Sequence, residues 1–506
     1  MKSTNQMIGL YLLCNTSIAS LVTGEIATSL FTSSNLRGRQ NALPFEDSEH
    51  VLCRVVTLDT MYFNETTNTT YTNDQITCLP IENNIELEEL EFPITLPANI
   101  LMQYEKEIEL GALLVEISDA KIDNDDLVIG LHSLYTAVNA TQQNRHLISR
   151  HLQIKSVMTV AVIRISTSDA QPAQTASQIK STLFNTNGIN FVNQYKDISY
   201  GKLTWSLSST GVLDIQMPNT VASYGSATAL VTAAQKIVKS KYQVSEVSGL
   251  ADRVLMCLPP GTGSWAASAG VNHWRAQFNN DWCTSLSGNM HELGHTMGLL
   301  HAQANGVEYA DRTGYMGSGY TSSTFPRKGF DGYNSWRFGW YSDRHFIIYP
   351  KTDGSRLVKV ASFVDYKKTA TDEYAVVNIN DQYYLMYNTQ KGFNIDTEQK
   401  QNQITVTEGL TTGTNSMAGL SVGGTKFTVS NYQGSGKALI VEACKTMTGS
   451  SGASIMQISI ALGKSVCGSS SRQYEEPNTS NSGSRSAFLR WIDLVKNRVQ
   501  SRLGSF

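Results

Sequence analysis

Charge is scarce in this chain of 506 residues, and its two signs nearly cancel. Asp, Glu, Lys and Arg make up 16% of the residues, and the formal net charge is -3. Nucleic acids and anionic membranes are bound through a surplus of basic residues, so the sequence gives no reason to expect either as a partner. Apolar residues make up 41%, as in a globular protein, and a polar but weakly charged surface suits an extracellular one.

Long apolar runs are also missing. No segment reaches the roughly 18 uninterrupted apolar residues of a membrane span, so we predict no transmembrane helix. The first residues, "MKSTNQMIGLYLLCNTSIASLVTGE", instead place one lysine before an apolar stretch from Met7 to Cys14, with small residues at Ala19 and Gly24. This layout predicts a secretory signal peptide over residues 1–24, with a short buried helix as the alternative. We therefore expect a secreted chain.

Cysteine is infrequent, and its number fits secretion. Of seven cysteines, Cys14 would leave with the signal peptide, and six would remain. Pairing by proximity, one of fifteen possible arrangements, joins Cys53 to Cys78, Cys257 to Cys283 and Cys444 to Cys467. Four acceptor triplets, beginning at Asn64, Asn68, Asn139 and Asn478, would be glycosylated in the same compartment.

The chain lacks an internal repeat but is long enough for two or three domains. Residues 25–150 are acidic with strand-like runs, which indicates a β-rich, propeptide-like region with cleavage near Arg145 or Arg150. Residues 151–344 alternate strand-like runs with helical periods and predict an α/β (α+β) domain with one mixed sheet. Residues 345–467 predict an all-β domain, and residues 468–506 a flexible linker followed by an amphipathic helix.

The stretch "GNMHELGHTMGLLHAQ" concentrates metal-binding side chains. His291 and His295 are four residues apart, so on a helix they share a face and can bind one ion, with Glu292 beside them. Gly298 can adopt the left-handed conformation that ends a helix, and the turn would bring His301 back as a third ligand. Three neutral imidazoles leave one position open on zinc, which is the arrangement of a catalytic site. A nucleotide site is not expected, because the "GTG" of residues 261–263 lacks a third glycine opening a helix.

The chemistry follows from the charge of the ion. Zinc lowers the pKa of bound water to about 7, so that hydroxide becomes available at neutral pH. Glu292 is the natural general base: it would accept the proton of that water and pass it to the leaving amine. We therefore predict one catalytic zinc ion, held by His291, His295 and His301, that hydrolyses peptide bonds.

The pattern "HELGHTMGLLH" resembles the long zinc signature of the metzincin metallopeptidases, and "YADRTGYMGSGY" places Met316 in a turn like the methionine turn beneath zinc in that clan. Within the clan the chain looks most similar to the gametolysin (autolysin) family of algal cell-wall metallopeptidases, because of Ala302, the block "EYADRTGYMG" and "GYNSWRFGWY". The resemblance implies a metzincin-like catalytic domain with an active-site helix. It also implies a structural Met316, and Asp311 as a brace or a surface turn residue.

The same resemblance implies a zinc metalloendopeptidase that acts on extracellular matrix or cell-wall glycoproteins. Some metzincins place a tyrosine two residues after the methionine, but here that residue is Ser318, and Tyr315 and Tyr320 are left without a role. A propeptide would keep the enzyme latent, and we expect Cys53 and Cys78 to be paired with each other rather than bound to zinc.

Two other functions are compatible with the ligands. The chain could be an inactive, zinc-stabilised wall or adhesion protein that binds through its β domain. It could also be a zinc hydrolase that acts on a non-peptide bond.

Overall fold

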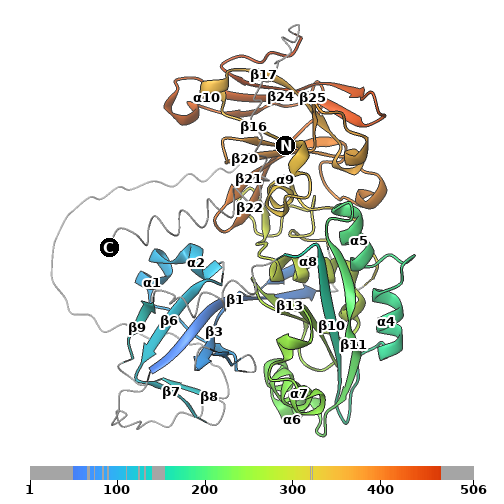
Figure 1. Ribbon diagram of the computed structural model, residues 1–506. Helices are drawn as coiled ribbons and strands as arrows, with labels where there is room; N and C mark the ends of the chain where they lie inside the picture. The colour runs from blue at the N-terminus through green and yellow to red at the C-terminus, as the bar shows by residue number, and fades with distance from the viewer. Residues whose placement is uncertain are drawn as a thin grey trace, which may run out of the picture. The chain divides into compact units, whose positions relative to one another are not determined.

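A computed structural model describes residues 50–468 except positions 65–68, 73, 83–84, 88–89, 110, 124–125, 130–132, 139–153, 320 and 322 (Figure 1). The predicted signal peptide, the cleavage sites at Arg145 and Arg150, Tyr320 and the C-terminal helix lie outside the described residues. The acceptor residues Asn68, Asn139 and Asn478 lie outside them as well. None of the helices that the structure describes is long and apolar enough to cross a membrane.

The first half of the described chain is built on a mixed sheet. Its strands run in the order β11-β10-β12-β14-β13-β1-β3-β4, and β10, β11, β12 and β14 are parallel while β13 is antiparallel to β14. The bounds are β10 Val157–Ser166, β11 Thr204–Gln216, β12 Arg253–Leu258, β13 Trp265–Gly270 and β14 Arg275–Asn279. This agrees with the predicted mixed α/β architecture.

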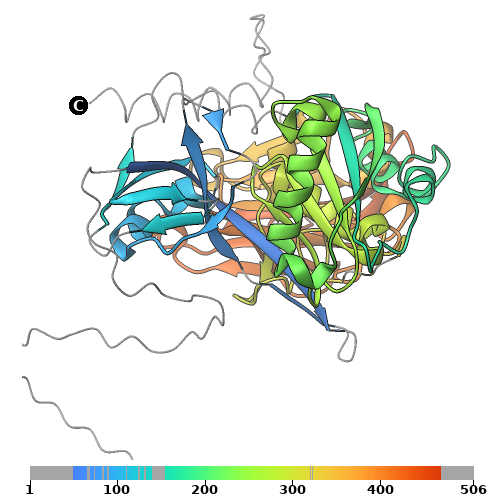
Figure 2. The same cartoon turned by 90° about the horizontal axis from the view of Figure 1, so that it is seen from below.

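Helices cover both faces of this sheet. Along β10, Val160 and Val162 face one core, which they share with α4 (Ala176–Leu183), α5 (Phe191–Ile198) and α8 (Leu286–Thr296). Ala161 and Ile163 face a second core, against α7 (Ala227–Tyr242), which Figure 2 shows lying across that face. The continuous apolar run of this strand is explained by burial on both sides.

Residues 174–195, which lie in the region of alternating strand-like runs and helical periods, form two helices. α4 ends at Leu183, and α5 begins only after Asn190, whose side chain accepts a hydrogen bond from the backbone N–H of Asn193. Between them, the side chain of Asn190 donates to the carbonyls of Thr182 and Asn185 and holds the loop. An asparagine that bonds its neighbours' backbone competes with helix continuation, and this interrupts the helical pattern.

Most of the strands that precede residue 139 extend the same sheet, whereas residues 120–123 and 126–129 pair only with each other. β1 (His50–Asn64) pairs with β3 (Gln75–Glu82) and β6 (Leu113–Ser118) through its first half and with β13 through its second half (Figure 2). Shorter strands complete this region: β2 Thr69–Thr72, β4 Ile85–Glu86, β5 Phe92–Pro93, β7 Ala120–Asp123, β8 Asp126–Ile129 and β9 Tyr135–Val138. Two short helices, α1 Ala98–Gln103 and α2 Glu105–Glu109, pack beside them.

From residue 345 onward the described chain is built mainly of strands, and its longest α-helix is α10 (Pro350–Asp353). One sheet has the order β15-β22-β21-β20-β19-β16 and the other β18-β17-β25-β24-β23, with a shared apolar core that includes Val358, Leu385 and Ile458. The first sheet comprises β15 Ala302–Ala304, β16 His345–Ile348, β19 Val376–Ile379, β20 Tyr383–Asn388, β21 Gln403–Leu410 and β22 Gly413–Leu420. The second comprises β17 Arg356–Ala361, β18 Glu373–Tyr374, β23 Phe427–Val429, β24 Leu439–Thr448 and β25 Ser454–Leu462.

Three disulfides connect the cysteines that are nearest in sequence. They join Cys53 to Cys78, Cys257 to Cys283 and Cys444 to Cys467, so the pairing expected from proximity is the one that forms. Disulfides persist in oxidising compartments, which fits an extracellular protein.

Candidate metal centre

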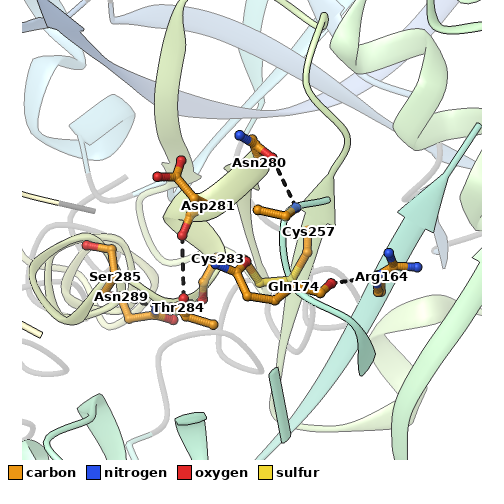
Figure 3. Close-up of a disulfide and its surroundings, with 10 residues drawn as sticks. Arg164, Gln174, Cys257, Asn280, Asp281, Cys283, Thr284, Ser285 and Asn289 are labelled. Carbon is orange, nitrogen blue, oxygen red and sulfur yellow. Dashed lines mark hydrogen bonds between the residues drawn. A yellow bond between two sulfur atoms is a disulfide. The ribbon is translucent and has the colours of Figure 1, made fainter. Parts of the chain in front are cut away.

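Helix α8 carries the histidine motif and is fixed at its N-terminus by local polar contacts. The Ser285 hydroxyl accepts a hydrogen bond from the backbone N–H of Gly288 and donates to the carbonyl of Thr321 at 2.6 Å. The Asn289 side chain donates to the carbonyls of Cys283 and Ser285. Cys283 is bonded to Cys257 at the end of β12, so the disulfide ties the sheet to the start of this helix (Figure 3).

The helix ends where the sequence predicts. Gly298 has a left-handed φ of 85°, and a Cβ on it would lie 2.6 Å from the side-chain oxygen of Asn272. A residue with a side chain is strained in this conformation and would also meet Asn272, so both conditions favour glycine. The turn returns the chain and brings His301 back to the face of α8 that carries His291 and His295.

The three imidazoles meet at one point. The Nε2 atoms of His291 and His295 are 2.9 Å apart, and those of His295 and His301 are 3.1 Å apart. Nitrogen ligands at zinc's usual bond length in a tetrahedron are about 3.3 Å from one another, so the spacing is close to that of a zinc site. All three predicted ligands are therefore brought together.

Each ring is oriented by an acceptor on its other nitrogen. The Nδ1 atom lies 2.8 Å from the Tyr315 carbonyl in His291, 2.9 Å from the Leu299 carbonyl in His295 and 2.6 Å from the Glu308 carboxylate in His301. An acceptor there requires the proton on Nδ1 and leaves the Nε2 lone pair for a metal ion. The surroundings of the rings thus select the tautomer that binds metal.

Burial and charge set the protonation of the three rings. Burial lowers the pKa of His291 to about 4 and also lowers the pKa of His295, which keeps both imidazoles neutral. For His301 the lowering by burial is outweighed by the negative charge of Asp59, which raises its pKa to about 10. Asp59 thus favours a positive charge at His301, whereas burial disfavours one at His291 and His295.

Glu292 lies on the same helix and is fully buried. Neither of its carboxylate oxygens has a hydrogen-bond partner among the described residues, and burial raises the pKa of this carboxyl well above its usual range. A buried carboxyl without a partner is costly, so its retention beside the histidines indicates a role in binding or proton transfer.

The turn that contains Met316 packs beneath α8. Gly294 stands between His291 and His295 in the sequence. The Met316 sulfur lies 2.6 Å from the position that a Cβ on Gly294 would occupy. Asp311 is completely buried, and its Oδ1 accepts hydrogen bonds from the backbone N–H and the hydroxyl of Thr313, which braces the turn. The Tyr315 hydroxyl donates to the Pro326 carbonyl, away from the metal position.

Two side chains at the centre were missed in the sequence. The Tyr309 hydroxyl contacts Nε2 of His301 and donates to Oδ1 of Asp59 at 3.1 Å. Oδ2 of Asp59 lies 3.3 Å, 3.4 Å and 3.7 Å from Nε2 of His295, His301 and His291 respectively. Tyr309 stands inside the block "EYADRTGYMG" that carried the family resemblance, and Asp59 is the one carboxylate inside the largely apolar stretch "RVVTLDTMYF".

Three converging histidines and a buried glutamate beside an α/β sheet form a candidate metal centre. Residues 157–375 match the model of the gametolysin peptidase M11 family. The matched segment includes the three histidines, Glu292, Tyr309 and Met316, and it confirms the resemblance seen in the sequence. No curated protein matches the chain.

Proposed function

We propose that the chain is a secreted zinc endopeptidase in which His291, His295 and His301 hold one catalytic ion. The observation that carries the proposal is the convergence of the three Nε2 atoms beside the buried, unpartnered carboxyl of Glu292. The donor set fits zinc because three imidazole nitrogens that converge on one point are typical of catalytic zinc sites. When bound, zinc would lower the pKa of water and polarise the carbonyl of the scissile peptide bond.

Glu292 acts as the general base of this proposed reaction. Its buried position and raised pKa suit a group that takes a proton from the attacking water and returns it to the leaving amine. Tyr309 is the second residue that we assign to the reaction. Its hydroxyl lies at the metal position, where a hydrogen-bond donor would stabilise the negative charge that develops on the carbonyl oxygen.

The substrates that we propose are proteins, in particular glycoproteins of an extracellular matrix or cell wall. The family of the matched segment supports a peptidase, and the three disulfides and the absence of a membrane-spanning helix in the described residues fit an extracellular location. We further propose a metzincin-type catalytic domain over residues 151–344, an N-terminal propeptide over 25–150 and a β-rich C-terminal domain over 345–467. Met316 would form the structural methionine turn.

The test compares Glu292→Gln with the wild-type chain after removal of the N-terminal region. We expect the variant to keep its zinc, because Glu292 is not a ligand, and to lose hydrolysis of a mixed protein substrate by about a thousandfold. Glu408→Gln, the same change on β21, serves as the matched control and should leave activity intact. Turnover retained in Glu292→Gln would refute the mechanism, and bound zinc without activity in any form would favour a structural zinc protein.

A further inference from the structure

The strand that carries Asp59 occupies the edge of the sheet next to the metal centre. Leu58 to Tyr62 of β1 pair antiparallel with Gly270 to Trp265 of β13, and Asp59 lies opposite Ala269. On its other side β13 pairs with β14, so without β1 it would be an edge strand with free backbone groups. Such an edge binds extended peptides by adding them as a further strand.

Asp59 is placed at this edge so that its carboxylate meets the histidines. The residue is 1% exposed, and its Oδ2 lies 3.3–3.7 Å from all three Nε2 atoms. Ligands of a tetrahedral zinc ion are about 3.3 Å apart, so Oδ2 takes the fourth corner of a tetrahedron whose other corners are the three nitrogens. Its Oδ1 accepts the Tyr309 hydroxyl, so both carboxylate oxygens are engaged by the centre.

Further contacts hold this strand at the centre. The backbone N–H of Val271 donates to the Thr57 carbonyl, and the Ser268 hydroxyl donates to the Asp59 carbonyl. Arg275 on β14 forms a buried ion pair with Glu91 of the N-terminal region at 2.6 Å. Burying a carboxylate costs free energy unless a cation compensates its charge. The position of Asp59 is therefore favourable only when there is positive charge among the histidines.

From this geometry we propose that β1 is an internal inhibitor of the peptidase and that the Asp59 carboxylate is the fourth ligand of its metal. The inference rests on the proposed function, because it needs a metal ion bound by the three histidines. In this state the position required for water and substrate is filled, the Tyr309 hydroxyl is engaged, and the peptide-binding edge of β13 is covered. Latency then depends on a carboxylate, while Cys53 and Cys78 are joined in a disulfide away from the metal.

The test uses the full chain loaded with cobalt(II), whose visible absorption reports its ligands, and acetohydroxamate as a small probe for an open metal position. We compare wild type, Asp59→Asn and the control Asp123→Asn, which makes the same change at an exposed residue of β7. We expect the cobalt spectrum of Asp59→Asn to differ from that of the other two. Its affinity for acetohydroxamate should be at least about tenfold higher, because the probe no longer competes with a ligand of the same chain.

Equal affinity and equal spectra in the wild type and Asp59→Asn would overturn the inference. If Asp59→Asn does not fold, the wild type decides alone: a cobalt spectrum unchanged by acetohydroxamate supports the inference, and a ready change overturns it. Failure of the folded chains to take up cobalt would remove the proposed function and the inference with it. An open centre in Asp59→Asn that binds the probe but cleaves no protein would support the role of Asp59 and count against the peptidase alone.

Discussion

At the level of single residues, the metal centre depends on acceptors that are not ligands. The carbonyls of Tyr315 and Leu299 and the carboxylate of Glu308 fix the tautomers of the three histidines. Two of these are backbone groups and survive any substitution at their positions, whereas Glu308 is replaceable. Substitution of Glu308 can therefore remove the acceptor that orients His301, whereas substitution of Tyr315 or Leu299 leaves a backbone acceptor in place.

The role proposed for Tyr309 is testable by removing one oxygen atom. Tyr309→Phe keeps the ring, whose centroid lies 4.0 Å from that of His301, and deletes the hydroxyl at the metal position. We expect zinc content and KM to be unchanged and kcat to fall by about a hundredfold in the chain freed of its N-terminal region. The control is Tyr349→Phe at an exposed tyrosine. A kcat equal to that of the control would exclude Tyr309 from the reaction.

His345 lies outside the metal centre, and its burial makes the stability of the protein depend on pH. Its ring stacks on Trp336 with centroids 4.0 Å apart, and neither of its nitrogens has a hydrogen-bond partner among the described residues. Burial, reinforced by the positive charge of Lys202 and opposed by Asp343, lowers its pKa from 6.5 to about 3. Below pH 6.5 His345 therefore binds a proton in the unfolded chain but not in the folded chain. The free energy of unfolding falls as the pH decreases.

Chemical denaturation between pH 7 and pH 5 measures this effect. We expect His345→Phe, which retains the stacking, to lose about 2 kcal/mol less stability over that interval than the wild type. His50→Phe, at an exposed histidine, should follow the wild type. Parallel stability curves for His345→Phe and the wild type would show that this imidazole does not titrate on unfolding.

At the level of elements, the position of α8 is set from both ends. Gly298 ends the helix in a left-handed conformation, and the Cys257–Cys283 disulfide ties the segment before it to β12. The helix itself is only 11 residues long, and all of them are buried. Precise placement of the histidines therefore depends on these two attachments and on packing rather than on the helix's own stability.

Removing the Cys257–Cys283 disulfide tests whether this bond positions α8 as well as stabilising the fold. The double variant Cys257→Ser with Cys283→Ser opens a loop with a sequence separation of 26, which should cost about 3 kcal/mol in unfolding free energy. The matched control is Cys444→Ser with Cys467→Ser, with a separation of 23, in the C-terminal strands. We expect similar losses of stability from both but weaker zinc binding only from the first. Equal zinc affinities would show that the Cys257–Cys283 bond does not position the helix.

The sequence was most informative where structure is decided locally. The glycine turn and the convergence of the three histidines both follow from spacing over a few residues. The break between α4 and α5 depends instead on the side chain of Asn190, which donates to the carbonyls of Thr182 and Asn185. A pattern of apolar positions contains no information about such side-chain to backbone bonds.

At the level of the whole molecule, sequence-based reasoning reaches its limit where distant segments meet. Asp59 approaches the histidines only through the register of β1 on β13, which pairs residues more than two hundred positions apart. Nothing near Asp59 in the sequence encodes that register, although a lone carboxylate in an apolar strand signals a buried partner. The family match begins at residue 157 and therefore does not include this aspartate.

The pairing of β15 with β22 has a consequence for biosynthesis. Residues 302–304, directly after the third ligand, pair in parallel with residues 414–416, and the backbone N–H of Thr414 donates to the His301 carbonyl at 3.0 Å. The ribosome produces the chain from its N-terminus at roughly 5–20 residues per second, so His301 emerges several seconds before the strand that supports it. The nascent chain already contains all its ligands during this interval, but the third one gains its final support only after most of the C-terminal strands have been translated.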